Sequence, residues 1–255
     1  MDRMALKRKL VSGKACLGTW VFMPSPDIME IIGLAGFDFA VIDMEHSAIT
    51  LSDAVSMIRA AETRGLAPLV RVSSLESTHI LRSLDSGAHG IQLPHIETAE
   101  DAEEAVRYSK YHPAGQRGVA TTTKGGGYTL DNIERHFISE NRSSVIVLSL
   151  ESKESLGDLD RIIEVPGADV IYIGPYDLSQ SMGMPGKVDA PKVLKAMETS
   201  IRKIRRARKV AGSFAKTAVR ARRLKDMGVN YLTCQADGSL IREAFEGIRS
   251  GIFKK

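Results

Sequence analysis

The sequence predicts a single (β/α)8 barrel, an α/β fold of the TIM-barrel class. The chain has 255 residues, and barrels of this class form one domain of about 250 residues. Eight short apolar segments recur along the chain, and the longer segments between them show the i, i+3, i+4 spacing of helices with one buried face. Alternation of such strands and helices indicates a parallel sheet covered on both faces, and eight units indicate that the sheet closes.

The expected strands are short runs rich in apolar and β-branched residues, as buried strands require. In chain order they cover residues 15–21, 37–43, 67–72, 90–94, 145–151, 169–174, 210–214 and 231–235. No internal linker separates these segments. Residues 1–255 are therefore expected to form one domain.

Helical spacing between the strands is clearest over residues 52–64 and 99–108. Several glycines precede an expected strand, at the point where the end of a helix favours a left-handed residue. These glycines are Gly36, Gly65, Gly87 and Gly228.

The composition excludes several classes of protein. Two cysteines, Cys16 and Cys234, are too few for a disulfide framework, and their spacing matches no zinc site. The first residues, MDRMALKRKL, lack the apolar segment of a secretory signal, and no stretch approaches the roughly 18 apolar residues that cross a bilayer. We therefore expect a cytoplasmic protein that does not bind a membrane.

The net charge is +4, from 35 Lys and Arg against 31 Asp and Glu. Much of the excess lies in residues 201–209 and 220–225. The first run could bind nucleic acid or an acidic partner, or it could be the solvated face of a helix whose Ile201, Ile204 and Val210 point inward. Only 5% of residues are aromatic, which leaves few rings for base stacking. We therefore expect a helix face and no nucleic-acid partner.

Ionisable residues follow several of the expected strands. They are Asp43, Glu45 and His46 after the second strand, Arg71 after the third, Glu151 at the fifth and Asp177 after the sixth. Taken singly, such a residue is commonly a helix cap, a surface ion pair or a hydrogen-bonded core histidine. However, the carboxyl ends of barrel strands meet at one rim, where enzymes of this fold carry their active sites. The joint occurrence therefore indicates an active site.

The residue types suggest a chemistry. Glu151 and Asp177 form a hard oxygen donor set suited to Mg²⁺ or Mn²⁺, with positions left for water and substrate. Such an ion can chelate a 2-oxo acid and stabilise the enolate that forms on its keto oxygen. Arg71 would add a permanent cation at that oxygen. His46 would carry the proton, since imidazole titrates near neutral pH, and Asp43 would orient its ring or hold its charge.

Two irregular segments leave alternatives open. The segment GPYDLS begins with a tight turn at Gly174 and Pro175, whose backbone N–H groups could receive a substrate carboxylate. The alternative is a helix start capped by Asp177 or Ser179. Residues 121–128 (TTTKGGGY) contain three consecutive glycines and form either a loop that approaches a ligand or a structural loop without one.

With these residues located, the chain resembles the metal-dependent (class II) pyruvate aldolases of the HpcH/HpaI family over nearly its whole length. The resemblance lies in the order and spacing of GFDFAVIDMEH, LVRV, LDSGAHGIQLPHIET, YHPAGQRGV, the strand that ends at Glu151, and IGPYDLSQSMGMPG. It implies a barrel of the phosphoenolpyruvate/pyruvate type. It also implies cleavage of a hydroxylated 2-oxo acid to pyruvate and an aldehyde.

The resemblance implies roles for the rim residues. Glu151 and Asp177 are the metal ligands, for Mg²⁺ or Mn²⁺ and also for Co²⁺. Arg71 stabilises the enolate oxygen. His46 is the acid/base group and acts on the substrate hydroxyl through metal-bound water.

Other implied features concern assembly. Asp43 and Asp85 match family positions that support the histidine, with Asp85 acting across a subunit boundary. Family members are hexamers, built as trimers of dimers with an exchanged C-terminal helix. This similarity implies a homo-oligomer and an intersubunit role for residues 241–253.

The chain departs from the family pattern near the expected pyruvate pocket, which Arg71, Gly174 and Pro175 would also line. Ser149 stands where the family usually has Gln, and it is too short to replace that contact without water. Tyr176 stands where the family usually has Ala, and it adds bulk and a hydroxyl. The family's Arg-containing loop is replaced by residues 121–128, in which Lys124 could offer the charge.

We therefore expect a metal-dependent carbon–carbon lyase that cleaves a 4-hydroxy-2-oxo acid to pyruvate and an aldehyde through a metal-bound enolate. One alternative is oxaloacetate decarboxylation, or a cyclase-like reaction, at the same site, because loss of CO₂ leaves the same enolate. An alternative of another class is a non-catalytic protein that binds partners through its basic surface.

Overall fold

Eight parallel strands close into a barrel in which each strand pairs with the next and β8 pairs with β1. The computed structural model describes residues 2–253. The strands are β1 Cys16–Val21, β2 Phe39–Asp43, β3 Ala67–Arg71, β4 Gly90–Leu93, β5 Val145–Leu150, β6 Val170–Ile173, β7 Val210–Ala215 and β8 Tyr231–Ala236. All eight expected strands are confirmed, with ends that differ by no more than two residues. The (β/α)8 prediction is therefore correct.

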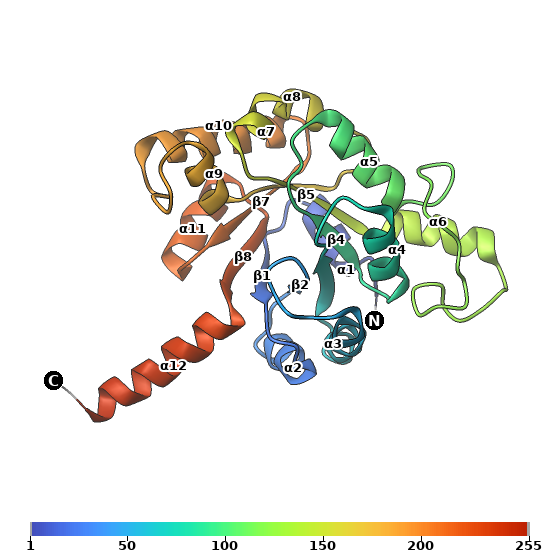
Figure 1. The fold of residues 1–255 in the computed structure, drawn as a ribbon, viewed down its shortest axis with the longest axis horizontal. Helices are drawn as coiled ribbons and strands as arrows, with labels where there is room; N and C mark the ends of the chain where they lie inside the picture. Colours follow the sequence, from blue (N-terminus) through green and yellow to red (C-terminus); the bar gives the residue numbers. More distant parts are fainter. Residues whose placement is uncertain (1, 254–255) are drawn as a thin grey trace.

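Helices surround the barrel (Figure 1). They are α1 Ala5–Val11, α2 Pro26–Leu34, α3 Leu51–Thr63, α4 Ser77–Asp85, α5 Ala99–Ser109, α6 Ile133–Ser143, α7 Lys153–Gly157, α8 Leu159–Ile162, α9 Pro175–Ser181, α10 Pro191–Arg206, α11 Ala218–Met227 and α12 Asp237–Ile252. The helices expected over residues 52–64 and 99–108 are confirmed as α3 and α5. The four glycines expected to be left-handed all have φ between 70° and 101°.

Alternation along the strands divides the core into two layers. In β2, Phe39 and Val41 belong to a cluster inside the barrel, whereas Ala40 and Ile42 pack with residues of the surrounding helices. This two-residue period is the geometry of a strand with both faces buried. The helix α1 adds Leu6 to the inner cluster, so it closes the end of the barrel at which the strands begin.

One glycine in the barrel wall is required by a close approach of backbone. A Cβ atom at Gly90 would lie 2.3 Å from the carbonyl oxygen of Val145, the residue that it faces on β5. Main chain at a strand pair cannot shift without breaking the ladder. The position therefore tolerates no side chain.

We expect Gly90→Ala to lower the free energy of unfolding by roughly 3 kcal/mol, as overpacking of a core does. Gly157→Ala is the matched control, because nothing lies within 4 Å of a Cβ at that position. Urea denaturation of both variants checks the prediction. A Gly90→Ala protein with the wild-type midpoint and slope would contradict it.

The basic run of residues 201–209 is the end of a packed helix and the turn that follows it. Ile201 and Ile204 are fully buried, as expected for the inner face of α10. Val210 was expected on that face, but α10 ends at Arg206 and Val210 begins β7. The Lys209 ammonium donates hydrogen bonds to the carbonyls of Val165 (2.7 Å) and Ala168 (2.9 Å). Part of the run is therefore structural rather than a free cationic surface.

The three-glycine segment packs against the end of α4. The N–H of Gly125 donates to the Asp85 carbonyl at 2.8 Å, and a Cβ at Gly125 would lie 2.2 Å from the Leu84 carbonyl oxygen. Lys124 forms an ion pair with Glu62 at 2.7 Å. The expectation that Lys124 offers a charge to the substrate pocket is therefore wrong within this chain. The glycines serve a close backbone contact.

Candidate active site

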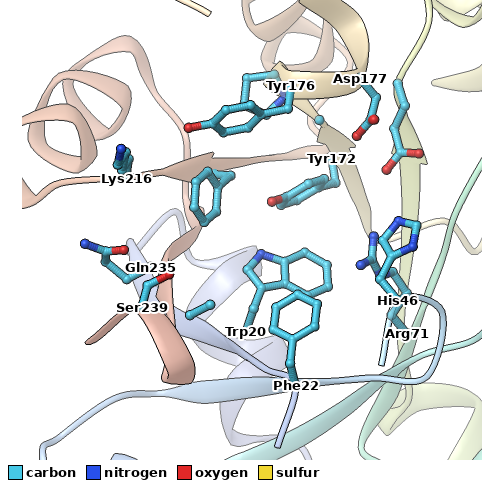
Figure 2. Close-up of a pocket in the computed structure, with 15 residues that line it drawn as sticks. Trp20, Phe22, His46, Arg71, Tyr172, Tyr176, Asp177, Lys216, Gln235 and Ser239 are labelled. Carbon is cyan, nitrogen blue, oxygen red and sulfur yellow. The ribbon is translucent and has the colours of Figure 1, made fainter. Parts of the chain in front are cut away.

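The rim residues meet at the carboxyl ends of the strands, around a cavity of about 330 Å³ (Figure 2). Its lining residues with carboxylate, imidazole or cationic side chains are His46, Arg71, Glu151, Asp177 and Lys216. Four of these were expected from the sequence, and they come from four different βα units. The barrel therefore brings together groups that are more than 100 residues apart in the chain.

Arg71 is held in a buried ion pair at the inner edge of the site. Its Nη2 contacts Asp43 Oδ2, and its Nε donates to Asp43 Oδ1 at 3.2 Å. Asp43 is fully buried, Arg71 is 8% exposed, and the guanidinium lies 4.3 Å from the centre of the Trp20 ring. Burial opposes the charge of Arg71, but Asp43 and Glu45 outweigh it and raise the pKa of the guanidinium. Arg71 is therefore a fixed cation.

Asp43 also shapes the turn that carries the histidine. Its Oδ1 accepts the backbone N–H groups of Glu45 at 2.9 Å and His46 at 3.1 Å. The expected contact was with the His46 ring, whereas the observed contact is with the His46 main chain. The imidazole itself is 64% exposed, with Nε2 3.9 Å from Glu45 Oε2. Asp43 thus positions His46 through the backbone and leaves the ring free to face the cavity.

Glu151 and Asp177 form an acidic pair at the site. Glu151 is 8% exposed, and burial together with the charge of Asp177 raises the pKa of its carboxyl group. Gly174 makes room for it, because a Cβ at that position would lie 3.0 Å from Glu151 Cγ. Two carboxylates that repel each other in a partly dry site are the donor set that a hard divalent cation stabilises. These residues therefore fit such an ion.

No group of three metal-binding side chains is found in residues 2–253. An ion held by Glu151 and Asp177 would consequently keep most of its coordination positions for water and substrate oxygens.

The expected substrate residues separate into two groups. Gly174, Pro175 and Tyr176 line the cavity. Ser149 does not: it is fully buried inside the barrel, where its hydroxyl accepts a hydrogen bond from the Gln92 side chain at 3.0 Å. The neighbouring strand β4 thus supplies an amide beside the short serine, so Ser149 has a structural partner instead of an open face.

The start of α9 resolves one alternative. No side chain caps this helix, whose N-cap is Gly174. Ser179 instead donates to the Tyr176 carbonyl at 2.6 Å, so the expected alternative of a cap by Asp177 or Ser179 is wrong. Asp177 is exposed in the cavity and remains available to a ligand.

Asp85 lies away from this cavity within the chain. It is the last residue of α4, a helix that returns from the carboxyl ends of the strands to the opposite end of the barrel. Its carboxylate pairs with Arg117 at 2.7 Å. In a single chain, Asp85 therefore does not support His46.

The structure adds a histidine that the sequence patterns did not single out. His95 follows β4 with φ +53°, a left-handed backbone unusual for a residue with a side chain. Its Nε2 lies 3.0 Å from Glu45 Oε1 and its Nδ1 3.4 Å from Glu151 Oε2. The signal that could have located it is its place directly after the fourth expected strand, at the same rim as Glu45 and Glu151.

The fold and the site together define a (β/α)8-barrel enzyme whose active site combines two carboxylates, an arginine and a histidine at the carboxyl rim. A family model described as HpcH/HpaI aldolase/citrate lyase matches residues 17–244. The chain belongs to this family. It is therefore an enzyme of the carbon–carbon lyase class, and the alternative of a non-catalytic basic-surface protein is wrong.

Similar proteins agree with this assignment. The 2-keto-3-deoxy-L-rhamnonate aldolase of Escherichia coli (strain K12) is 33% identical over 248 residues, which cover 97% of this chain and 92% of that protein. The crystal structure of an HpcH/HpaI aldolase from Desulfitobacterium hafniense DCB-2 superposes with a TM-score of 0.94 at 30% identity, covering 99% and 98% of the two chains. A family protein from Burkholderia cenocepacia J2315 gives a TM-score of 0.93 at 30% identity, covering 98% and 99%.

Proposed function

We propose that this chain is a divalent-metal-dependent aldolase that cleaves a 4-hydroxy-2-oxo acid to pyruvate and an aldehyde. The observation that carries the proposal is the convergence of the acidic pair Glu151 and Asp177 on a cavity that also holds Arg71. When bound by these two carboxylates, Mg²⁺, Mn²⁺ or Co²⁺ would supply Lewis-acid stabilisation of negative charge on the keto oxygen.

The chain's own residues account for the proton and the charge. His46 accepts the proton of the C4 hydroxyl, the C3–C4 bond breaks, and the aldehyde leaves. The electron pair of that bond becomes the enolate of pyruvate, whose oxygen Arg71 stabilises with its fixed charge. His46 then gives up the proton that it accepted, and protonation of C3 by this proton or by one from water completes pyruvate. The aromatic wall, which includes Trp20 and Tyr172, limits water around the developing charge.

The first experiment measures pyruvate release from 4-hydroxy-2-oxopentanoate by a coupled dehydrogenase assay. We expect turnover with added Mg²⁺ or Mn²⁺, loss of turnover with a chelator, and recovery when the ion is restored. A protein that releases no pyruvate from this substrate or its longer homologues with any of the three ions would overturn the proposal.

The nearest rival is oxaloacetate decarboxylation at the same site. The same fold carries a different reaction in the citrate synthase SbnG, whose structure superposes with a TM-score of 0.87 at 28% identity over 97% of each chain. Loss of CO₂ also leaves pyruvate enolate but requires no hydroxyl to be deprotonated.

His46→Ala separates the two reactions. We expect the variant to lower aldol cleavage by about 10²–10⁴-fold, the usual contribution of a general base, and to lower oxaloacetate decarboxylation much less. The ratio of kcat values for the two substrates is the measurement. Equal losses in both reactions would remove His46 from the role of base.

We also propose that the protein is a cytoplasmic homo-oligomer, specifically a hexamer in which α12 is exchanged between subunits. The helix points away from the barrel (Figure 1), and its apolar residues Leu240, Phe245, Ile248 and Ile252 are exposed in the single chain. Exposed apolar surface of this kind favours burial against another copy. In such an assembly Asp85 would reach the His46 of a neighbouring subunit.

None of the helices described for residues 2–253 has the length and apolar character to cross a bilayer.

Sedimentation velocity checks the assembly. The wild type should sediment as a hexamer, and Phe245→Asp combined with Ile248→Asp should shift it to smaller species. Val11→Asp is the matched control, because Val11 is an equally exposed apolar residue on α1. A wild type that sediments as a monomer at micromolar concentration would contradict the proposal.

A further inference from the structure

The cavity has a second polar end, which the proposed mechanism does not use. Figure 2 shows Asp177, His46 and Arg71 on one side of the cavity and Lys216 on the other, with the ring of Trp20 between them. Lys216 follows β7 directly, so it belongs to the same rim of the barrel. The cavity therefore carries cations at both ends of an aromatic middle section.

Lys216 has no acidic partner among the described residues, unlike the nearby Arg220. Arg220 pairs with Asp189, and the Gln235 side chain binds Glu243 at 3.2 Å. Within the described part of the chain, no carboxylate lies at ion-pair distance from Lys216. An ammonium that lines a cavity without a counter-ion attracts anions to that cavity.

A second cavity, of about 440 Å³, adjoins this end and reinforces its charge. Tyr176, Phe214 and Lys216 line both cavities, and the rings of Tyr176 and Phe214 meet edge to face at 5.8 Å. The second cavity adds Arg220 and Arg223, and its lining includes one carboxylate against three cations. Both cavities thus meet at Lys216, on the more positive side.

We propose that Lys216 binds an anionic group at the far end of the substrate, so that the aldehyde product carries a terminal oxyanion. This inference rests on the proposed aldolase function and specifies its substrate class. The keto acid end lies against Arg71, Glu151 and Asp177. The remainder of the substrate crosses the aromatic middle section, and its terminal carboxylate or phosphate meets the Lys216 ammonium. Both groups present the same oxyanion chemistry to Lys216.

The charges explain why an anion is preferred here over a neutral group. Arg71 is paired with Asp43 and Glu45, and Arg220 with Asp189, whereas no carboxylate that lines either cavity lies at ion-pair distance from Lys216. A hydrogen bond to a charged group in a partly desolvated site is stronger than one to a neutral group. The site therefore discriminates between aldehydes by the charge of the group at the end opposite the reacting carbon.

The experiment runs the reaction in the direction of condensation, with pyruvate and pairs of aldehydes that differ in the terminal charge. The pairs are 4-oxobutanoate with butanal, and glyceraldehyde 3-phosphate with glyceraldehyde. We expect kcat/KM to favour the anionic member of at least one pair. In Lys216→Met this preference should fall by roughly 10- to 100-fold, the effect of one charged hydrogen bond. The pair that shows the fall identifies a carboxylate or a phosphate as the bound group.

Two variants serve as controls. Lys216→Arg keeps the charge and should retain most of the preference, and Lys14→Met removes an exposed lysine at the other end of the barrel and should retain all of it. No preference in the wild type, or an equal loss for charged and neutral aldehydes in Lys216→Met, would overturn the inference.

A separate readout distinguishes failure of this inference from failure of the proposed function. NMR can follow the exchange of the pyruvate methyl protons in D₂O, which reports enolate formation without any aldehyde. Mg²⁺ is used in place of Mn²⁺, because Mn²⁺ would broaden the signals. Exchange without a preference for anionic aldehydes overturns only the role of Lys216. Absence of exchange in the wild type overturns both proposals.

Discussion

Asp177→Ala and Glu151→Ala should each lower metal-dependent turnover by roughly a thousandfold or more, because the lost stabilisation of the enolate is worth several kcal/mol. Both residues line the cavity, and the charge of Asp177 acts on the carboxyl group of Glu151. Asp160→Ala is the matched control, since Asp160 is an exposed carboxylate that pairs with Lys203 outside the site. Pyruvate release is the measurement. Full activity of metal-stripped Asp177→Ala would contradict the mechanism.

A further variant, Glu151→Gln, should differ from the wild type in thermal stability. Burial and Asp177 raise the pKa of Glu151, so the ionised form is disfavoured in the fold. The stability that the protonated Glu151 carboxyl group contributes is complete below its unfolded pKa of about 4.5. It is lost as the pH rises through the higher pKa of the folded state. We expect metal-free Glu151→Gln to have a higher Tm than the metal-free wild type at neutral pH. Added Mn²⁺ should raise the Tm of the wild type but not that of the variant.

Arg71→Met should lower the free energy of unfolding by about 3–5 kcal/mol, because it leaves the buried Asp43 carboxylate without a counter-ion. It should also abolish turnover, because the charge that stabilises the enolate oxygen is lost. Arg64→Met is the control, since the Arg64–Glu30 pair is on the surface and such pairs contribute about 1 kcal/mol or less. Urea denaturation of the two variants gives the comparison.

The double variant Asp43→Asn with Arg71→Met isolates the pair. It should recover part of the stability lost in Arg71→Met, since the fully buried Asp43 charge is removed and Glu45 keeps His95 at 3.0 Å, but it should recover no activity. Equal destabilisation by Arg71→Met and Arg64→Met would show that the Asp43–Arg71 pair does not hold this edge of the site together.

Much of the barrel could be predicted from local patterns. A buried strand needs apolar residues on both faces, so segments such as Phe39–Asp43 are visible as short apolar runs. The left-handed Gly36 and Gly228 follow from the need to end a helix before the next strand. The rim residues Arg71 and Glu151 were predicted because a charge directly at the end of an apolar strand has few structural uses.

Other features depend on neighbours that are distant in the chain. Lys124 looked available to the substrate, but Glu62 lies across from it in space and takes its charge. Ser149 looked like part of the pocket, but a strand alternates its faces and places Ser149 inside the barrel beside Gln92. His95 gave no periodic signal, because its role arises from a turn that places one imidazole between Glu45 and Glu151.

The (β/α)8 fold, the family and the acidic pair could be predicted from the chain alone, since these depend on periodicity and on residue order along each strand. The folded barrel was needed to show which side chains share the cavity, that Asp43 binds the backbone of His46, and that Lys216 faces the acidic pair across an aromatic section. The difference arises because burial pattern is a local property of a strand or helix. Contact and charge pairing are set by how eight separate units close into one barrel.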